Sequence, residues 1–126
     1  MNIWGIILLV VLVMSGIMIS FGLWFSIAAP KRINLIFGYR TPMSMKNADT
    51  WHFGNVFAGK LMWRLGALLL ACSLITLFVI MGDSTSIIRT AGIIIIIAHA
   101  VMIFGTVILT EVALHRNFDR HGNPKR

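Results

Sequence analysis

Acidic residues are scarce in this sequence, and charges of either sign are few. Four aspartates and glutamates stand against 11 lysines and arginines in 126 residues, so the formal net charge is +7 although only 12% of residues are charged. Hydrophobic residues make up 58%, and the mean hydropathy is +0.88. A soluble domain of this size has too little interior to bury so much apolar surface, so we expect a lipid bilayer to solvate most of the chain. We expect no nucleic-acid partner, and we attribute the positive charge to anionic lipid head groups.

The residues that usually carry chemistry are equally scarce. Cys72 is the single cysteine, which excludes an internal disulfide and a cysteine-based metal cluster. No carboxylates are close together in the sequence, and the metalloprotease, hydrolase, phosphate-loop and dinucleotide motifs are absent. We therefore predict a protein that is not an enzyme, with no catalytic residues, no metal and no cofactor.

Three long apolar runs predict three transmembrane helices, over about 3–29, 62–82 and 88–112. The first would be about 40 Å long as a helix, which exceeds a hydrocarbon core of ~30 Å, so it should tilt or protrude. It is also too long for the apolar region of a signal peptide, so we expect it to stay uncleaved. The isoleucines at 93–97 would suit a strand in a soluble protein, but a lone strand cannot pair its backbone in lipid. The expected fold is an all-α integral membrane protein, one domain over 1–126.

The basic residues predict the orientation of the chain. All lysines and arginines except Arg89 lie in or beside the first connection, 30–61, or in the tail, 115–126. By the positive-inside rule, the loop and the tail are cytoplasmic and the N-terminus lies outside. The Gly-Asn-Pro sequence at 122–124 predicts a loosely ordered tail.

The cytoplasmic loop between the first and second spans is expected to be structured. The segment 34–37 is amphipathic and suits the membrane interface. The sequence Gly-Tyr-Arg-Thr-Pro at 38–42 predicts a turn, because glycine and proline flank it. Asn47 is a suitable N-cap for a helix beginning at Ala48, which could continue into the second span.

Four polar and aromatic residues of this region are candidates for binding. The planar guanidinium of Arg40 could pair with a lipid phosphate or a partner carboxylate, or Arg40 could be a positive-inside arginine beside an interfacial Tyr39. Trp51 could grip a ligand or anchor the chain at the interface. The Asn55 amide needs partners near the membrane boundary, and we predict a hydrogen bond to the 38–41 turn.

His99 lies near the middle of the third span, where a polar side chain suggests function. It could form a proton relay or bind a ligand. The structural alternative is a hydrogen bond to another helix, through Ser15, Ser73 or Thr76.

Glu111 and His115 form a helix-end pair at i, i+4 near the cytoplasmic side. Two ligands do not make a metal site, and a salt bridge is the commoner arrangement. Glu111 could instead pair with Arg40, Lys60 or Arg64 and thereby fasten the third helix to the loop.

The polar residues of the loop and of the helix that follows resemble the signature of the SdpI family of bacterial membrane proteins. The residues that carry the resemblance are, in order, Asn34, Gly38-Tyr39-Arg40-Thr41-Pro42, Ser44-Met45-Lys46-Asn47, Trp51, Asn55, Gly59 and Lys60. The family includes the immunity protein against the SDP killing peptide. That immunity protein resembles a longer form of this module, with further membrane helices before it. The resemblance implies a multi-pass protein of the bacterial plasma membrane that confers immunity to, or senses, a membrane-active peptide toxin. The residues it implies for ligand or partner recognition are Asn34, Gly38, Tyr39, Arg40, Thr41, Trp51, Asn55 and Lys60.

Two other functions remain open at the level of sequence. A small transporter or channel component would use His99 and the glycines and serines of the first span, and would require a homo-oligomer because three helices rarely enclose a pathway. An interfacial lipid-modifying enzyme would use Arg40 to hold a phosphate, although no nucleophile or base is visible beside it. The expected partners are anionic lipids and either a peptide toxin or a signalling protein.

Overall fold

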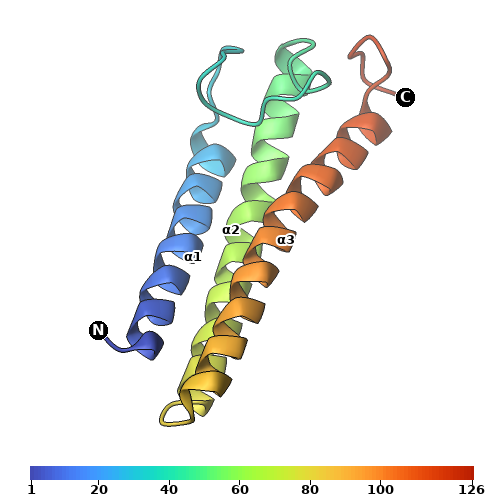
Figure 1. Ribbon diagram of the computed structural model, residues 1–126. Coiled ribbons are helices and arrows are strands. Elements are labelled where there is room, and N and C mark those ends of the chain that lie inside the picture. The colour runs from blue at the N-terminus through green and yellow to red at the C-terminus, as the bar shows by residue number, and fades with distance from the viewer.

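The computed structural model describes residues 1–126 as a bundle of three helices, shown in Figure 1. These are α1 (Ile3–Ala28), α2 (Ala48–Val79) and α3 (Thr85–Asn117). Consecutive helices run in opposite directions, so the loop between α1 and α2 and the C-terminal tail lie at the same end (Figure 1). We call this the basic end, and the opposite end, where a short turn joins α2 to α3, the hairpin end. Each helix is long and apolar enough to cross a membrane, which confirms the predicted all-α multi-pass membrane protein.

The second helix begins well before the predicted span. Asn47 is its N-cap, as predicted: the Asn47 side chain accepts from the Thr50 N–H at 2.9 Å, and the Thr50 hydroxyl accepts from the Asn47 N–H at 3.1 Å. Residues 48–61, assigned to the cytoplasmic loop, are helical, as expected for a helix that begins at Ala48 and continues into the second span. The non-helical connection is therefore shorter than 30–61. At ~1.5 Å per residue α2 is about 48 Å long, so it extends beyond a hydrocarbon core of ~30 Å.

Two glycines allow α1 and α2 to approach closely near the basic end. A Cβ atom on Gly22 would lie 2.4 Å from the Trp63 backbone nitrogen, and one on Gly59 would lie 2.6 Å from the Ser26 backbone nitrogen. Both neighbours are helix backbone, which cannot move aside as a flexible side chain could. Since the hydrophobic effect does not drive helix association in lipid, close backbone contact of this kind contributes to holding the helices together.

A histidine and a serine connect α1 to α3 inside the bundle. Both His99 and Ser15 are fully buried, and the His99 Nε2 atom lies 2.9 Å from the Ser15 hydroxyl. The other ring nitrogen, Nδ1, lies 2.9 Å from the Ile95 carbonyl oxygen. Because a carbonyl only accepts, Nδ1 carries the hydrogen. Of the three predicted partners of His99, Ser15 is the one that the structure places beside it.

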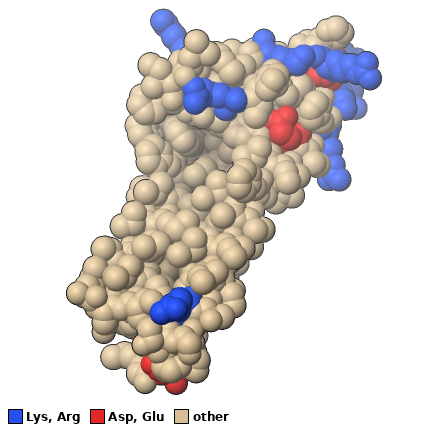
Figure 2. All heavy atoms as spheres, in the orientation of Figure 1, with Lys and Arg blue, Asp and Glu red and all other residues tan.

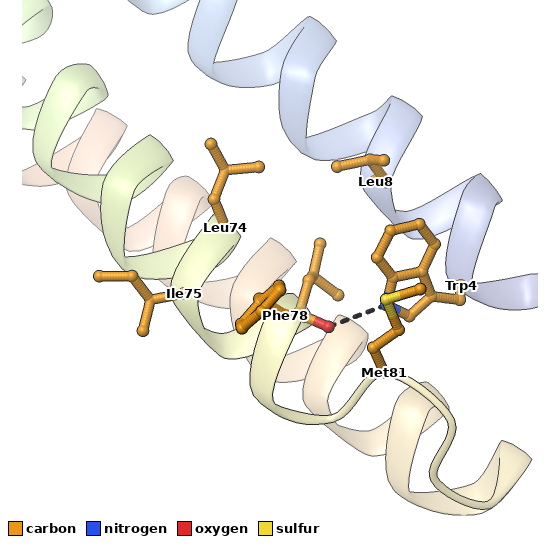
Figure 3. Close-up of a pocket in the computed structure, with 7 residues that line it drawn as sticks. Trp4, Leu8, Leu74, Ile75, Phe78 and Met81 are labelled. Atoms are coloured by element: carbon orange, nitrogen blue, oxygen red, sulfur yellow. Dashed lines mark hydrogen bonds between the residues drawn. The ribbon is translucent and has the colours of Figure 1, made fainter.

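The buried core near the hairpin end is apolar. Ile7, Val11, Leu77, Ile88 and Ile95 form this core. Beside it a groove of about 480 Å³ is lined only by hydrophobic side chains, with Trp4 and Leu8 of α1 facing α2 in Figure 3. The Trp4 indole N–H donates to the Leu77 carbonyl at 2.9 Å, which ties the first turn of α1 to α2 (Figure 3).

Candidate functional site

A buried asparagine helps to dock the loop turn onto α2. The Asn55 side-chain oxygen accepts a hydrogen bond from the Tyr39 backbone N–H at 2.7 Å, and its amide donates to the Trp51 carbonyl at 2.9 Å. Asn55 is 0% exposed. The predicted hydrogen bond between Asn55 and the 38–41 turn is thus confirmed. Gly38 has a φ of +108°, and a Cβ there would lie 2.5 Å from the Asn55 side-chain oxygen, so only glycine fits this turn.

Trp51 holds the beginning of the loop. Its indole N–H donates to the Pro30 carbonyl at 2.6 Å, and its ring packs against Gly38. Only 1% of Trp51 is exposed. The interpretation of Trp51 as an interfacial anchor was therefore wrong, and its ring has no free face to grip a ligand. A buried indole N–H needs an acceptor, and a carbonyl just beyond the end of α1 is available.

Thr41 and Ser44 give the turn its shape. The Thr41 N–H donates to the Ser44 hydroxyl at 2.8 Å, and that hydroxyl in turn donates to the Tyr39 carbonyl at 2.9 Å. The Thr50 hydroxyl donates to the Ser44 carbonyl at 3.1 Å, which links the turn to the first turn of α2. Ser44 is fully buried, yet it was not predicted as a site residue. Its place three residues after Thr41, in a serine-threonine turn, is the signal that could have identified it.

Tyr39 fastens the same turn to α3. Its hydroxyl donates to the Glu111 carboxylate at 2.7 Å and lies 3.1 Å from the Val107 carbonyl oxygen. Burial of the phenol, and then the hydrogen bond and the charge of Glu111, raise the pKa of Tyr39 well above its ordinary value. The other Glu111 oxygen lies 3.7 Å from His115, so the predicted helix-end pair is present.

The alternative considered for Glu111, a pair with Arg40, Lys60 or Arg64, is not formed. Those three side chains are exposed at the basic end, where water competes for their charge. Tyr39 is half-buried between the loop and α3, so its hydroxyl reaches Glu111 without ordering a long flexible chain. The predicted link between loop and third helix exists, but a phenol makes it.

The C-terminal tail forms an ordered turn, contrary to the prediction of a loose one. The Asp119 carboxylate accepts from the backbone N–H groups of His121 and Asn123 at 2.8 and 2.9 Å. Hydrogen bonds from Asn123 and His121 lower the pKa of Asp119. The Asn47 side chain donates to the Gly122 carbonyl at 2.7 Å. The tail turn is thus ordered by the acceptors that Asp119 supplies, and the bond from Asn47 docks it beside the N-terminus of α2.

The exposed part of the site is basic. Figure 2 shows that lysine and arginine atoms gather at the basic end, whereas little charge lies near the hairpin end. Arg40 and Lys60 are exposed, while Asn34, Gly38 and Thr41 are half-buried. The Arg40 guanidinium donates to the Leu35 carbonyl, which fixes its place over the loop.

A polar pocket of about 450 Å³ opens beside the pair of Tyr39 and Glu111. Its lining residues come from the turn, the end of α3 and the tail, namely Pro42, Met43, Lys46, Glu111, His115 and Arg120. They carry both signs of charge. No cluster of three or more His, Cys, Asp or Glu side chains is placed to hold a metal ion.

Comparison with known proteins supports the resemblance seen in the motif. The model of the SdpI/YfhL protein family matches residues 31–110, which include the loop, α2 and most of α3. The uncharacterized protein YfhL of Bacillus subtilis (strain 168) is 34% identical over 64 residues, which are 51% of this chain and 58% of that protein. The match therefore spans less than two thirds of that relative. No solved structure matches the chain. Because the family match covers well over half of the sequence and includes the docked loop, the protein belongs to the SdpI/YfhL family.

Proposed function

We propose that the protein is a non-enzymatic membrane interaction protein that confers immunity to, or senses, a membrane-active peptide toxin through its basic end. The observation that carries this proposal is the docked loop. Asn55 joins the loop to α2, and Tyr39 joins it to Glu111 on α3. The loop therefore has a defined shape, with Arg40 and Lys60 exposed beside it.

The hydrogen bonds of the loop favour recognition over catalysis. Trp51, Asn55 and Ser44 direct their polar atoms at backbone groups of the loop, so they are engaged in holding its shape. A surface that is already ordered loses little conformational entropy when a partner binds. The Arg40 fork can form two parallel hydrogen bonds with a carboxylate of a peptide. These residues thus have separable roles, with Asn55 and Trp51 positioning the loop and Arg40 contacting the partner.

A survival assay tests the proposal. Bacteria sensitive to an SDP-type killing peptide would express the wild-type chain, Arg40→Ala or Arg126→Ala at matched membrane abundance. Arg126→Ala is the control, because Arg126 is an exposed cation at the same end that makes no hydrogen bond. We expect the wild type and Arg126→Ala to protect the cells and Arg40→Ala to lose most of the protection.

Two results would contradict this function. If well-expressed wild type gave no protection, immunity to this class of peptide would be refuted. If Arg40→Ala protected as well as the wild type, the assignment of Arg40 to the contact surface would be wrong.

A further inference from the structure

The loop exposes large apolar side chains between α1 and the docked turn. Leu35 is 78% exposed, Ile36 74% and Phe37 53%. Exposure of three neighbouring hydrophobic side chains to water is unfavourable, because burial of each would lower the free energy. Their exposure indicates that something apolar covers them in the membrane.

The Asn34 side chain fixes the shape of this tip. Its oxygen accepts from the backbone N–H groups of Ile36 and Phe37 at 3.0 and 2.7 Å, and its amide donates to the Arg32 carbonyl at 3.1 Å. The turn therefore forms around one side chain, and the apolar residues are left pointing outward instead of into the bundle. Asn34, assigned to recognition by the resemblance, is in the structure a positioning residue.

The tip continues the outer surface of α1. The Phe37 ring lies 6.3 Å from the Trp24 ring, and Trp24 stacks with Phe21 and Phe25 at 6.1 and 5.9 Å. Trp24 is half exposed on the outside of the bundle. Aromatic side chains at the end of a transmembrane helix mark the depth of the lipid head groups. The aromatic contact thus sets the tip against the outer surface of α1, next to side chains of the kind that lie at that depth.

Cations flank the apolar tip. Lys31 and Arg32 precede it and are exposed, and the bond from Arg40 to the Leu35 carbonyl holds a guanidinium against it. Apolar side chains next to lysine and arginine bind membranes that carry anionic lipids, because insertion and charge attraction add together.

We propose that residues 31–37, together with the aromatic end of α1, form a surface that binds anionic phospholipid, with Leu35 and Ile36 inserted below the head groups. Lys31 and Arg32 pair with lipid phosphates, and Asn34 holds the tip in the inserting shape. This surface needs no peptide, so its tests are independent of the immunity assay.

The depth of the tip can be measured with a spin label. The full chain would carry Cys72→Ser with either Leu35→Cys or His121→Cys, and would be labelled and placed in nanodiscs of phosphatidylcholine with phosphatidylglycerol. We expect the label at position 35 to be accessible to oxygen and protected from a water-soluble nickel chelate. The label at 121, on the exposed tail turn, should show the opposite pattern.

Two outcomes of this measurement would overturn the proposal. Equal access of the nickel chelate to positions 35 and 121 would show that the tip lies in water. Magnetic broadening between labels at position 35 of different chains would show that a second copy covers the tip, in place of lipid.

The preference for anionic lipid can be measured separately. Native mass spectrometry would count the phosphatidylglycerol retained by the wild type, by Lys31→Gln/Arg32→Gln and by the control Arg116→Gln/Arg126→Gln. We expect each cation lost beside the tip to weaken retention by about fivefold, and the control to change it little. Equal loss in both double variants would show only a general effect of charge and would refute a defined surface.

Variants of Asn34 test its positioning role with the same label at position 35. Asn34→Ala removes both acceptor contacts, so the label should become accessible to the nickel chelate. Asn34→Asp keeps a carboxylate that can accept both N–H groups, so the label should stay protected. Unchanged protection in Asn34→Ala would show that Asn34 does not position the tip.

Discussion

Replacing Asn55 by alanine should release the loop without unfolding the bundle. The change removes the acceptor of the Tyr39 backbone N–H, the one hydrogen bond by which the Asn55 side chain holds the 38–41 turn. The helices keep their own packing, because the side chain of Asn55 otherwise bonds only to the Trp51 carbonyl of its own helix.

The size of the effect follows from the Tyr39 backbone N–H, which would lose its acceptor. An unpaired buried N–H costs about 1–3 kcal/mol. Tyr39 is only half-buried, so water can partly replace the lost partner, and the lower part of this range, about 1–2 kcal/mol, applies. Opening of the loop should therefore become about 5- to 30-fold more frequent.

Hydrogen exchange in detergent micelles or nanodiscs measures this opening. The informative amides are those of Thr41 and Met45, which donate to the Ser44 hydroxyl and to the Thr41 carbonyl. Both should exchange about 5- to 30-fold faster in Asn55→Ala. Asn117→Ala is the matched control, because Asn117 makes the same bond to the carbonyl four residues earlier, but it is exposed and has no bond to the loop.

Unchanged exchange at both amides in Asn55→Ala would refute the reasoning. It would mean that Trp51 and the serine-threonine turn hold the loop without the Asn55 bond. Faster exchange throughout α2 and α3 would also contradict it, because the bundle itself would then depend on Asn55.

Three further predictions concern the helix contacts and the phenol. Gly59→Ala should lower the free energy of unfolding by about 1–3 kcal/mol in steric-trapping measurements, because the added methyl would meet the backbone of α1. Gly105→Ala is the control, since a Cβ there meets nothing within 4 Å and should cost little. Equal effects of the two changes would contradict the close approach of α1 and α2. Ser15→Ala should cost about 1 kcal/mol, and a double-mutant cycle with His99→Ala should show coupling between the two residues; additive losses would exclude an energetic role for that hydrogen bond. The chain has one tyrosine, so tyrosinate absorbance reports Tyr39 alone and should rise only above the ordinary pKa of 10.0. Since the pKa of Tyr39 is raised in the folded protein, the stabilisation from neutral Tyr39 is complete below pH 10.0 and is lost as the pH rises above it. Tyr39→Phe should lack this loss. A midpoint of the tyrosinate absorbance at pH 10.0 would contradict the buried contact.

Much of this architecture follows from local properties of the chain. The three spans are predictable because a run of apolar residues long enough to cross ~30 Å of hydrocarbon has few alternatives to a helix. The start of α2 is predictable because Asn47 accepts from an N–H within its own first turn. The bond of Asn55 is predictable in kind, since an amide near the membrane boundary must be paired.

Only the tertiary structure decided which groups meet. The sequence left Trp51 as either a ligand contact or an interfacial anchor, but the path of the loop buries it against Pro30 and Gly38. For Glu111 the sequence offered His115 or a cation of the basic end, but not Tyr39, whose hydroxyl donates to it at 2.7 Å. Helix crossing and loop direction set these distances, and neither can be obtained from spacing along one chain.

The sequence by itself determined the membrane location, the number of helices and the polar residues that required partners, because hydropathy and unpaired hydrogen-bonding groups act locally. The tertiary structure decided that the polar residues of the motif mostly hold the loop, while cations and apolar side chains form its outer surface. The physical reason is that burial depends on neighbours distant in sequence. Asn55 and Trp51 become positioning residues only when α1, α2 and the loop are assembled around them.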